Sequence, residues 1–347
     1  VRKSRAQARS WRLGPGVQAG LKPTAKQQSR QTMAHVPKNP NIAMRDGVSP
    51  SCLALPRVRN SPWPALIDHL AERLPRISRS EWTERMRAGS VLGEDGHPLE
   101  PDAPYAGGTR VYYWRELPNE QPIPFEASVL FEDEHLVVAD KPHFLPVTPG
   151  GRYVRETLLV RLKTRLQCPD LSPLHRIDRE TAGLVLLAKR AQDRDAYQML
   201  FRERRVDKVY EAVAPWREDL AFPLTRTSHI LEDEQAFYRM REALPHEGLL
   251  PNSETRIDCM RREGARALYR LQPVSGKRHQ LRVHMWGLGL PIEGDQFYPF
   301  VRRGPGEAED FAQPLQLLAR DIAFTDPVTG QPRQFSSAQR LAMELPA

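Results

Sequence analysis

Residues 175–189 read HRIDRETAGLVLLAK, a charged loop that runs directly into an apolar stretch. The apolar part, residues 184–188, shows no alternation with polar residues, which is typical of a strand buried on both faces. Asp178 stands among basic side chains just before this strand, and nearby positive charge keeps a carboxylate ionised at neutral pH. These residues predict an ionised acid at the edge of a sheet. Taken alone, they fit a solvated loop of alternating charge equally well.

The composition is that of a globular protein. The chain has 347 residues, of which 40% are hydrophobic and 27% are charged, enough for two domains and a sizeable core. No apolar run approaches the ~20 residues of a membrane helix, so we expect no membrane span. The 32 prolines indicate many turns and extended linkers.

The positive charge of the chain is concentrated at its start. Residues 1–32 hold eight basic residues and no acidic one, so the remaining residues balance at 43 basic and 43 acidic. The tail is either a disordered basic arm that binds phosphates or an over-extended reading frame in which Met33 is the true start, and we favour the second. Any affinity of the body for nucleic acid must then come from a local basic groove.

The sequence lacks the signatures of metal and nucleotide sites. Cys52, Cys168 and Cys259 are odd in number and far apart, with neither a CxxC pair nor a zinc spacing. No glycine-rich phosphate loop is present. We therefore expect a protein of the reducing cytoplasm, with no metal and no cofactor.

Three regions follow one another along the chain. Residues 1–60 are predicted to be a disordered basic tail and linker. Residues 61–117 are predicted to form a small α+β module, with helices at 66–74 and 78–88 and short strands at 91–92 and 111–114. This module resembles an S4-like RNA-binding domain, and a generic α+β extension is the alternative. Its basic face would be supplied by Arg76, Arg79, Arg85 and Arg87.

Residues 118–347 are predicted to form the main domain. Strand patterns occur at 129–131, 136–139, 184–188, 209–213, 267–271 and 317–324, and helical patterns occur at 157–166 and 191–204. Because strands and helices mix without a regular βαβ rhythm, we predict an α+β fold with a mixed, largely antiparallel sheet. A further helix is predicted from about His279 to Gly289, with Arg278, Arg282 and Trp286 on one face.

Together with the Asp178 loop, three further segments resemble the RluA-type family of RNA pseudouridine synthases. The family pattern His-Arg-Leu-Asp-x-x-Thr-Ser-Gly is similar to residues 175–183, and its Lys-x-Tyr strand to Lys208 and Tyr210. Its Gly-Arg-Thr-His-Gln-Ile-Arg-Val-His segment is similar to residues 276–284, with Lys277 and Arg278 in place of Arg and Thr. One segment departs: Lys-Pro-Gly-Gly-Leu becomes KPHFL at residues 141–145. The resemblance covers residues 125–340 and implies a pseudouridine-synthase-like catalytic domain over residues 118–347.

The resemblance also implies roles for individual residues. Asp178 would be the essential carboxylate at the glycosidic centre, Arg282 its ion-pair partner, and Tyr210 the tyrosine that stacks on the target base. Arg176 would fill the gap left by a flipped-out uridine, and His175 would orient the loop. The remaining expected contacts to RNA are Lys208, Lys277, Arg278 and His279.

The implied function is the site-specific isomerisation of uridine to pseudouridine in structured RNA, either rRNA or tRNA, without a cofactor. A noncatalytic RNA-binding or ribosome-assembly factor on the same fold is the alternative. A nucleoside glycosidase is disfavoured because hydrolysis normally uses two positioned carboxylates and only one is evident. We expect a monomer. The target uridine, and whether Asp178 acts as nucleophile or base, stay open.

Overall fold

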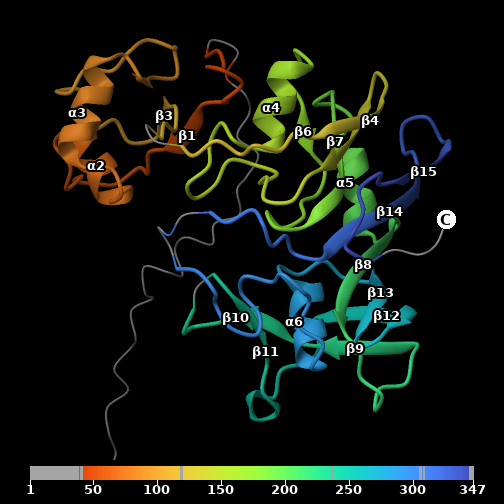
Figure 1. The fold of residues 1–347 in the computed structure, drawn as a ribbon. Helices are drawn as coiled ribbons and strands as arrows, with labels where there is room; N and C mark the ends of the chain where they lie inside the picture. The colour runs from red at the N-terminus through yellow and green to blue at the C-terminus, as the bar shows by residue number, and fades with distance from the viewer. Residues whose placement is uncertain are drawn as a thin grey trace, which may run out of the picture. The chain divides into compact units, whose positions relative to one another are not determined.

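The computed structural model describes residues 39, 42–117, 120–236, 238–304, 307 and 309–343 (Figure 1). The basic tail predicted over residues 1–32 and the alternative start at Met33 lie outside the described residues. Apart from Asn39, the described residues belong to one compact unit, Asn41–Ala347. Within them, no helix is both long and apolar enough to cross a membrane.

The N-terminal part is a small α+β module, as the sequence predicts. Helices α2 (Leu66–Arg73) and α3 (Arg79–Arg87) pack on an antiparallel sheet of order β1-β3-β2. Ser78 caps α3 by accepting a hydrogen bond from Glu81 N at 3.2 Å. Leu70 and Trp82 are fully buried between the helices and the sheet. The three strands are β1 (Ser51–Ala54), β2 (Val91–Leu92) and β3 (Arg110–Tyr113).

Strand β1 corrects the prediction that residues 1–60 are tail and linker. It pairs with β3 in the register Ser51↔Tyr113 to Ala54↔Arg110, so ordered structure begins before residue 61. The four residues of β1 carry no local strand signal, and this strand forms because a partner some 60 residues away supplies its hydrogen bonds. Local sequence patterns cannot show such pairing.

The predicted basic face of the module is partly neutralised. Arg79 forms an ion pair with Asp68, and Arg85 pairs with Glu81 at 2.8 Å. Two of the four arginines expected to face RNA therefore already have acidic partners. The S4-like character of this module stays a prediction.

The main domain is built on a mixed, largely antiparallel sheet, which confirms the predicted fold class. The order of its central path is β4-β5-β7-β14-β8-β13-β12-β9, with β15 pairing with β14 and β6 with β7. Only β7 and β14 run parallel among the described neighbours. The strands are β4 (Ser128–Glu132), β5 (Leu136–Lys141), β6 (Ser172–Pro173), β7 (Ala182–Ala188), β8 (Asp207–Pro215), β9 (Leu224–Ser228), β12 (Ser253–Glu263), β13 (Arg266–Pro273), β14 (Leu317–Thr325) and β15 (Pro332–Ser336).

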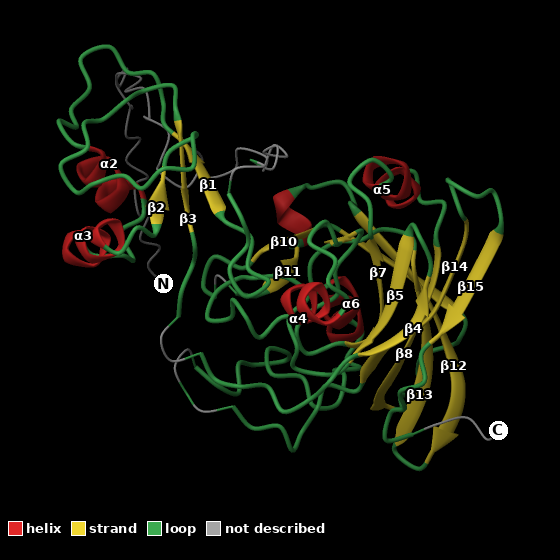
Figure 2. Cartoon of the chain, turned by 90° about the horizontal axis from the view of Figure 1, so that it is seen from above, coloured by secondary structure: helices red, strands yellow, loops and turns green. Residues whose placement is uncertain are grey.

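Three helices cover the sheet. Helix α4 (Leu158–Arg165) packs on one face with Val137 and Val185, whereas α5 (Arg194–Arg202) packs on the other with Leu136 and Leu184. The alternation follows from the two-residue period of a strand. Helix α6 (Gln280–Gly287) lies on the α4 side, over β8 and β13 (Figure 2). All three confirm predicted helices. Beside α6 stands a hairpin of β10 (Ile230–Glu232) and β11 (Met240–Glu242), followed by the 3-10 turn η1 (Pro245–Glu247).

Gly183 lets the two halves of the sheet join. It pairs with Ala319 where β7 meets β14, and its φ is +108°. A Cβ atom here would lie 2.3 Å from the Ala319 carbonyl oxygen. Only glycine allows this close approach, which sets the loop before β7 beside the start of β8 and α6.

Candidate active site

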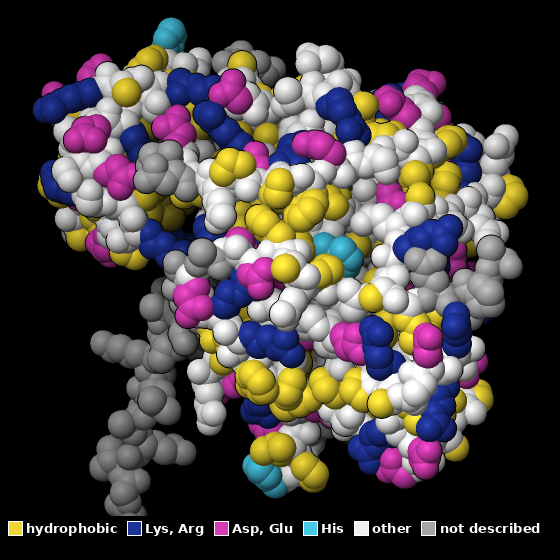
Figure 3. All heavy atoms as spheres, viewed as in Figure 1, with side chains coloured by type: hydrophobic (Ala, Val, Ile, Leu, Met, Phe, Trp, Pro, Cys, Tyr) yellow, Lys and Arg dark blue, Asp and Glu magenta, His cyan; other side chains and the backbone are white. Residues whose placement is uncertain are grey.

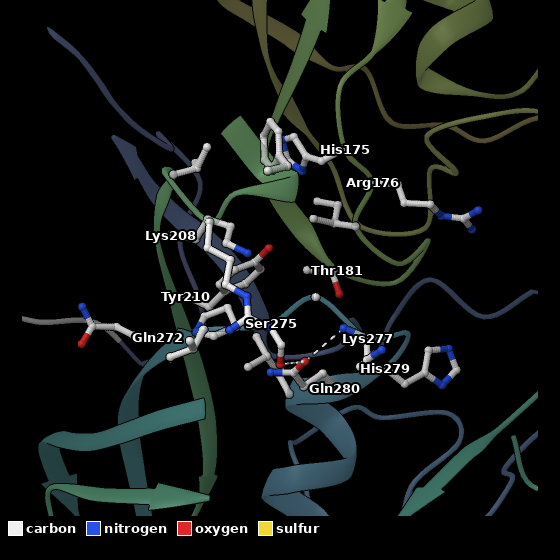
Figure 4. Close-up of a pocket in the computed structure, with 18 of the residues that line it drawn as sticks. His175, Arg176, Thr181, Lys208, Tyr210, Gln272, Ser275, Lys277, His279 and Gln280 are labelled. Atoms are coloured by element: carbon white, nitrogen blue, oxygen red, sulfur yellow. Dashed lines mark hydrogen bonds between the residues drawn. The ribbon is translucent and has the colours of Figure 1, made fainter. Parts of the chain in front are cut away.

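A cleft of about 700 Å³ opens where the loop before β7 meets the start of β8, the end of β13 and the start of α6. We call it the Asp178 cleft (Figure 4). Its described lining holds more positive than negative side chains, with Asp178 and Asp207 as the acidic ones. Elsewhere basic and acidic side chains mix over the face drawn in Figure 3. The cleft is therefore a local basic groove on a charge-balanced body. Its cations are Arg176, Arg202, Arg204, Lys208, Arg256, Lys277 and Arg282.

The structure joins Asp178 to Arg282 across 104 residues of sequence. The Arg282 guanidinium donates from Nη1 to Asp178 Oδ2 at 3.2 Å. The Arg282 side chain has no solvent exposure, whereas 23% of the Asp178 side chain is exposed to the cleft. The predicted ion pair is present, and its carboxylate faces the space that a substrate could enter.

Arg282 is fixed by a second carboxylate that the sequence analysis did not single out. Asp295 accepts two hydrogen bonds from Arg282, one from Nε at 2.8 Å and one from Nη2 at 2.6 Å, and its side chain is 1% exposed. Glu180 approaches Arg282 Nη1 at 3.5 Å. Asp295 follows Gly294 in the turn after α6. The only sequence signal for its role was its position, 13 residues after an arginine in a predicted helix.

Asp178 is ionised at neutral pH. Burial alone would raise its pKa, but the positive charges of His279 and Arg282 and the hydrogen bond from Arg282 lower it below the usual value. Burial lowers the pKa of His279 to about 4, so its ring is neutral at pH 7. At pH 7 the positive charges that keep Asp178 ionised are therefore those of Arg282 and, more weakly, Arg176.

Two side chains from β5 and the following turn hold the Asp178 loop from behind. Lys141, fully buried, donates to Arg179 O at 3.0 Å, and His143 Nδ1 bonds Glu180 O at 2.8 Å. Burial lowers the pKa of Lys141 to about 7. The KPHFL segment, which departs from the family pattern, thus contributes His143 as an additional donor to the loop.

Tyr210 and Lys208 project from β8 into the Asp178 cleft, as predicted (Figure 4). Burial and the negative charge of Asp178 raise the pKa of Tyr210, so the phenol is protonated. Burial, and then the charge of Arg204, lower the pKa of Lys208. Tyr210 therefore presents a ring face and a hydroxyl donor beside Asp178.

His175 and Arg176 have different surroundings although they are adjacent. His175 Nε2 accepts a hydrogen bond from Leu186 N at 3.1 Å, its ring stacks on Phe201 at 4.7 Å, and burial lowers its pKa to about 3. A neutral ring that accepts a backbone N–H fits the predicted orienting role. Arg176 is exposed, lines the cleft and extends away from Tyr210 in Figure 4.

The remaining three residues predicted to contact RNA differ in their position relative to the cleft. Lys277 lines the Asp178 cleft and is exposed. Arg278 is absent from the cleft lining, because it precedes α6 and donates to Tyr238 O at 2.7 Å. The predicted shared face of Arg278 and Arg282 is therefore wrong. His279 is 7% exposed, stacks on Phe297 and lies 4.0 Å from Asp178, so it lines the cleft as a buried neighbour of the carboxylate.

The described residues contain no cluster of three or more His, Cys, Asp or Glu side chains placed to hold a metal ion. The three cysteines are free.

Known proteins are similar to this chain in sequence and in fold. The family model for RNA pseudouridylate synthase matches residues 135–286. A Synechocystis protein named an uncharacterized RNA pseudouridine synthase is 33% identical over 242 residues, 70% of this chain and 80% of that protein. The Vibrio cholerae dual-specificity RNA pseudouridine synthase RluA is 34% identical over 206 residues, 57% of this chain and 77% of its own. The structure of human RNA pseudouridylate synthase domain containing 1 superposes with a TM-score of 0.50 at 21% identity, covering 62% of this chain and 84% of that one, which supports the fold.

Proposed function

The chain belongs to the RluA-type family of RNA pseudouridine synthases, enzymes that isomerise uridine to pseudouridine in RNA, and we propose that Asp178 is the essential carboxylate of this reaction. One observation carries the proposal. Asp178 is the acid in the cleft that is both paired with a buried guanidinium and partly exposed to the space a nucleotide would fill.

The reaction needs an ionised carboxylate at the sugar. The N1–C1′ bond breaks, the base turns, a C5–C1′ bond forms, and the C5 proton is lost as N1 gains one. A carboxylate can attack C1′, stabilise its positive charge or accept a proton. All three roles require the ionised carboxylate, which the lowered pKa of Asp178 provides at neutral pH, and we leave the choice among them open.

We assign Tyr210 to base stacking. Its ring lines the cleft beside Asp178, and an aromatic face can hold the uracil while its glycosidic bond is open. Because its phenol is protonated, Tyr210 can donate a hydrogen bond but needs another group to take its proton before it could accept one from C5.

We assign Arg176 to the space vacated by the flipped nucleotide. Extruding a base from a stack costs a few kcal/mol, and a planar guanidinium that stacks with the neighbours offsets part of this loss. Arg176 is exposed at the cleft and forms no ion pair with any described residue, so it is available for such contact.

The substrate we propose is structured RNA, rRNA or tRNA, bound through the cations of the Asp178 cleft. The N-terminal module would add an S4-like RNA contact through Arg76 and Arg87, for which no acidic partner occurs among the described residues. A cytoplasmic location and a monomeric state stay predictions from the sequence.

The test compares two acids of the same cleft. Asp178→Asn should abolish the release of tritium from RNA labelled at uridine C5 while leaving RNA affinity nearly unchanged, because phosphate contacts dominate binding. Asp207→Asn is the matched control, since Asp207 also lines the cleft but forms no ion pair with any residue that the structure describes. Full tritium release by Asp178→Asn, or equal losses in both variants, would contradict the proposal.

The noncatalytic alternative gives no reason for the Asp178–Arg282 pair, because a buried cation and its acids carry a desolvation penalty that simple RNA binding does not require. The glycosidase alternative needs a correction. A second carboxylate, Glu180, does lie near Asp178, but the pKa of Glu180 is also lowered, because nearby arginines outweigh its burial. Hydrolysis needs one carboxyl with a raised pKa to act as the acid.

A further inference from the structure

Arg204 has an unusual backbone conformation at the end of α5. The helix ends in a Schellman motif, in which Arg204 N donates to Phe201 O at 3.3 Å and Arg205 N to Leu200 O at 2.8 Å. The φ of Arg204 is +57°, in the left-handed region where glycine or asparagine is ordinarily found. An arginine here is less stable than a glycine would be.

The Arg204 side chain lines the Asp178 cleft and has no acidic partner in the described part of the chain. No ion pair joins it to any described residue, and its charge contributes to the lowered pKa of Lys208. Two neighbouring cations repel each other, and an anion placed between them removes that penalty. The adjacent Arg205 differs, because it pairs with Glu203 at 2.7 Å and does not line the cleft.

Arg256 extends the cleft in a second direction. It is exposed on β12, its cross-strand neighbours are the neutral Gln272 and Thr225, and it forms no ion pair among the described residues. Because side chains alternate along a strand, Arg256 faces away from Ile257, which packs beneath α6. Gln272 correspondingly lies apart from Lys277 in Figure 4. The cleft therefore continues over the ends of β12 and β13, away from α6.

We propose that Arg204 and Arg256 bind phosphodiester groups of the substrate RNA beside the target uridine, at the edge of the Asp178 cleft away from α6. The proposal rests on the proposed function for the identity of the RNA. A guanidinium fork matches two phosphate oxygens, which a hydrated ammonium does less well. Such contacts set the position and affinity of the strand, not its sequence.

The experiment measures binding of a fluorescein-labelled oligouridylate to the full chain across a salt series. Arg204→Gln and Arg256→Gln should each weaken binding and lower the slope of log K against log salt by about 0.7, the loss of one single-strand phosphate contact. The matched control Arg205→Gln should leave both unchanged. Arg204→Gly should weaken binding equally while raising the thermal midpoint by about 2 °C, because glycine relieves the left-handed backbone.

In Arg204→Gly, weaker RNA binding together with a higher thermal midpoint separates RNA contact from a structural role. An unchanged salt slope in Arg204→Gln and Arg256→Gln, or an equal fall in Arg205→Gln, would overturn the proposal. Tritium release from uridine-labelled RNA by the unaltered chain is measured in parallel. If that release is absent while the slopes fall as expected, the phosphate contacts stand and the proposed function fails. Intact release with unchanged slopes rejects the phosphate contacts alone.

Discussion

Two carboxylates of this protein, Asp178 and Asp326, have contrasting surroundings. Asp326 is fully buried in the turn between β14 and β15 and accepts hydrogen bonds from Val328 N at 2.9 Å, Thr329 N at 3.1 Å and the Tyr197 hydroxyl. Asp178 has one close guanidinium and a partly exposed oxygen edge. A carboxylate enclosed by donors stabilises a turn, whereas one left with unused acceptor capacity in a cleft is suited to react.

The largest expected effect is that asparagine at these two positions has opposite consequences: one variant loses stability and the other loses turnover. Asp326→Asn should lower the free energy of unfolding by about 3 kcal/mol, because an amide nitrogen would face donors that need an acceptor. Its turnover per folded molecule should persist. Asp178→Asn should change stability by less than about 1 kcal/mol, since Arg282 keeps Asp295, while turnover is lost. Urea unfolding and tritium release, measured on both variants, check this; a large stability loss in Asp178→Asn would contradict it.

Asp295→Asn should affect Asp178 indirectly, through Arg282, and so tests the comparison further. Losing the charged two-point contact frees Arg282 to shift, and a displacement of about 1 Å at a reacting group lowers the rate roughly 100-fold. The pKa of Asp178 should rise as its cation moves, so the acidic limb of the kcat/KM profile should move to higher pH. A lower rate with an unmoved acidic limb would indicate a merely structural role for Asp295.

Acid should destabilise the fold through its buried histidines. Burial lowers the pKa of His175 to about 3 and those of His279 and His284 to about 4. The unfolded chain binds these protons near pH 6.5, whereas the folded chain does not, so stability is full above pH 6.5 and falls as pH decreases toward 4. We expect a loss of a few kcal/mol between pH 7 and pH 4 in urea titrations. A flat profile over that range would contradict neutral, buried rings.

Two carboxylates should cause a further loss of stability at lower pH. The pKa values of Asp178 and Asp326 are both lowered despite burial, by cations and hydrogen bonds, so their contribution is present above about pH 4 and is lost as pH falls further.

The smallest expected effect concerns Arg176. Arg176→Ala should lower turnover several-fold on a target uridine within a stacked hairpin and less on a free single strand, because only the stacked site has a gap to fill. Parallel kinetics on the two RNAs measure the difference. Equal losses on both would remove the gap-filling role.

Elements with a strong local pattern could be predicted from the sequence. The helices around Leu162, Tyr197 and Met285 and the apolar strand ending at Ala188 all form as expected. Strand β12 was not predicted, because its sequence SETRIDCMRRE is largely polar on the exposed face and depends on neighbours on both sides.

The sequence predicted those site residues that lie within a matched family motif. Asp178, Tyr210 and Arg282 meet at the cleft as the resemblance implied. Asp295 and His143 were not singled out, because their importance lies in contacts made across turns whose geometry the sequence does not state. The αL conformation of Arg204 was equally hidden, since nothing local distinguishes it from Arg205.

The most direct test of the role of Asp178 is a pseudouridine map of RNA from cells whose only copy of this gene carries Asp178→Asn, beside cells carrying Asp207→Asn. We expect the sites modified by the unaltered enzyme to vanish in the first strain and to persist in the second. Survival of those sites with Asn at position 178 would show that the reaction does not depend on this carboxylate.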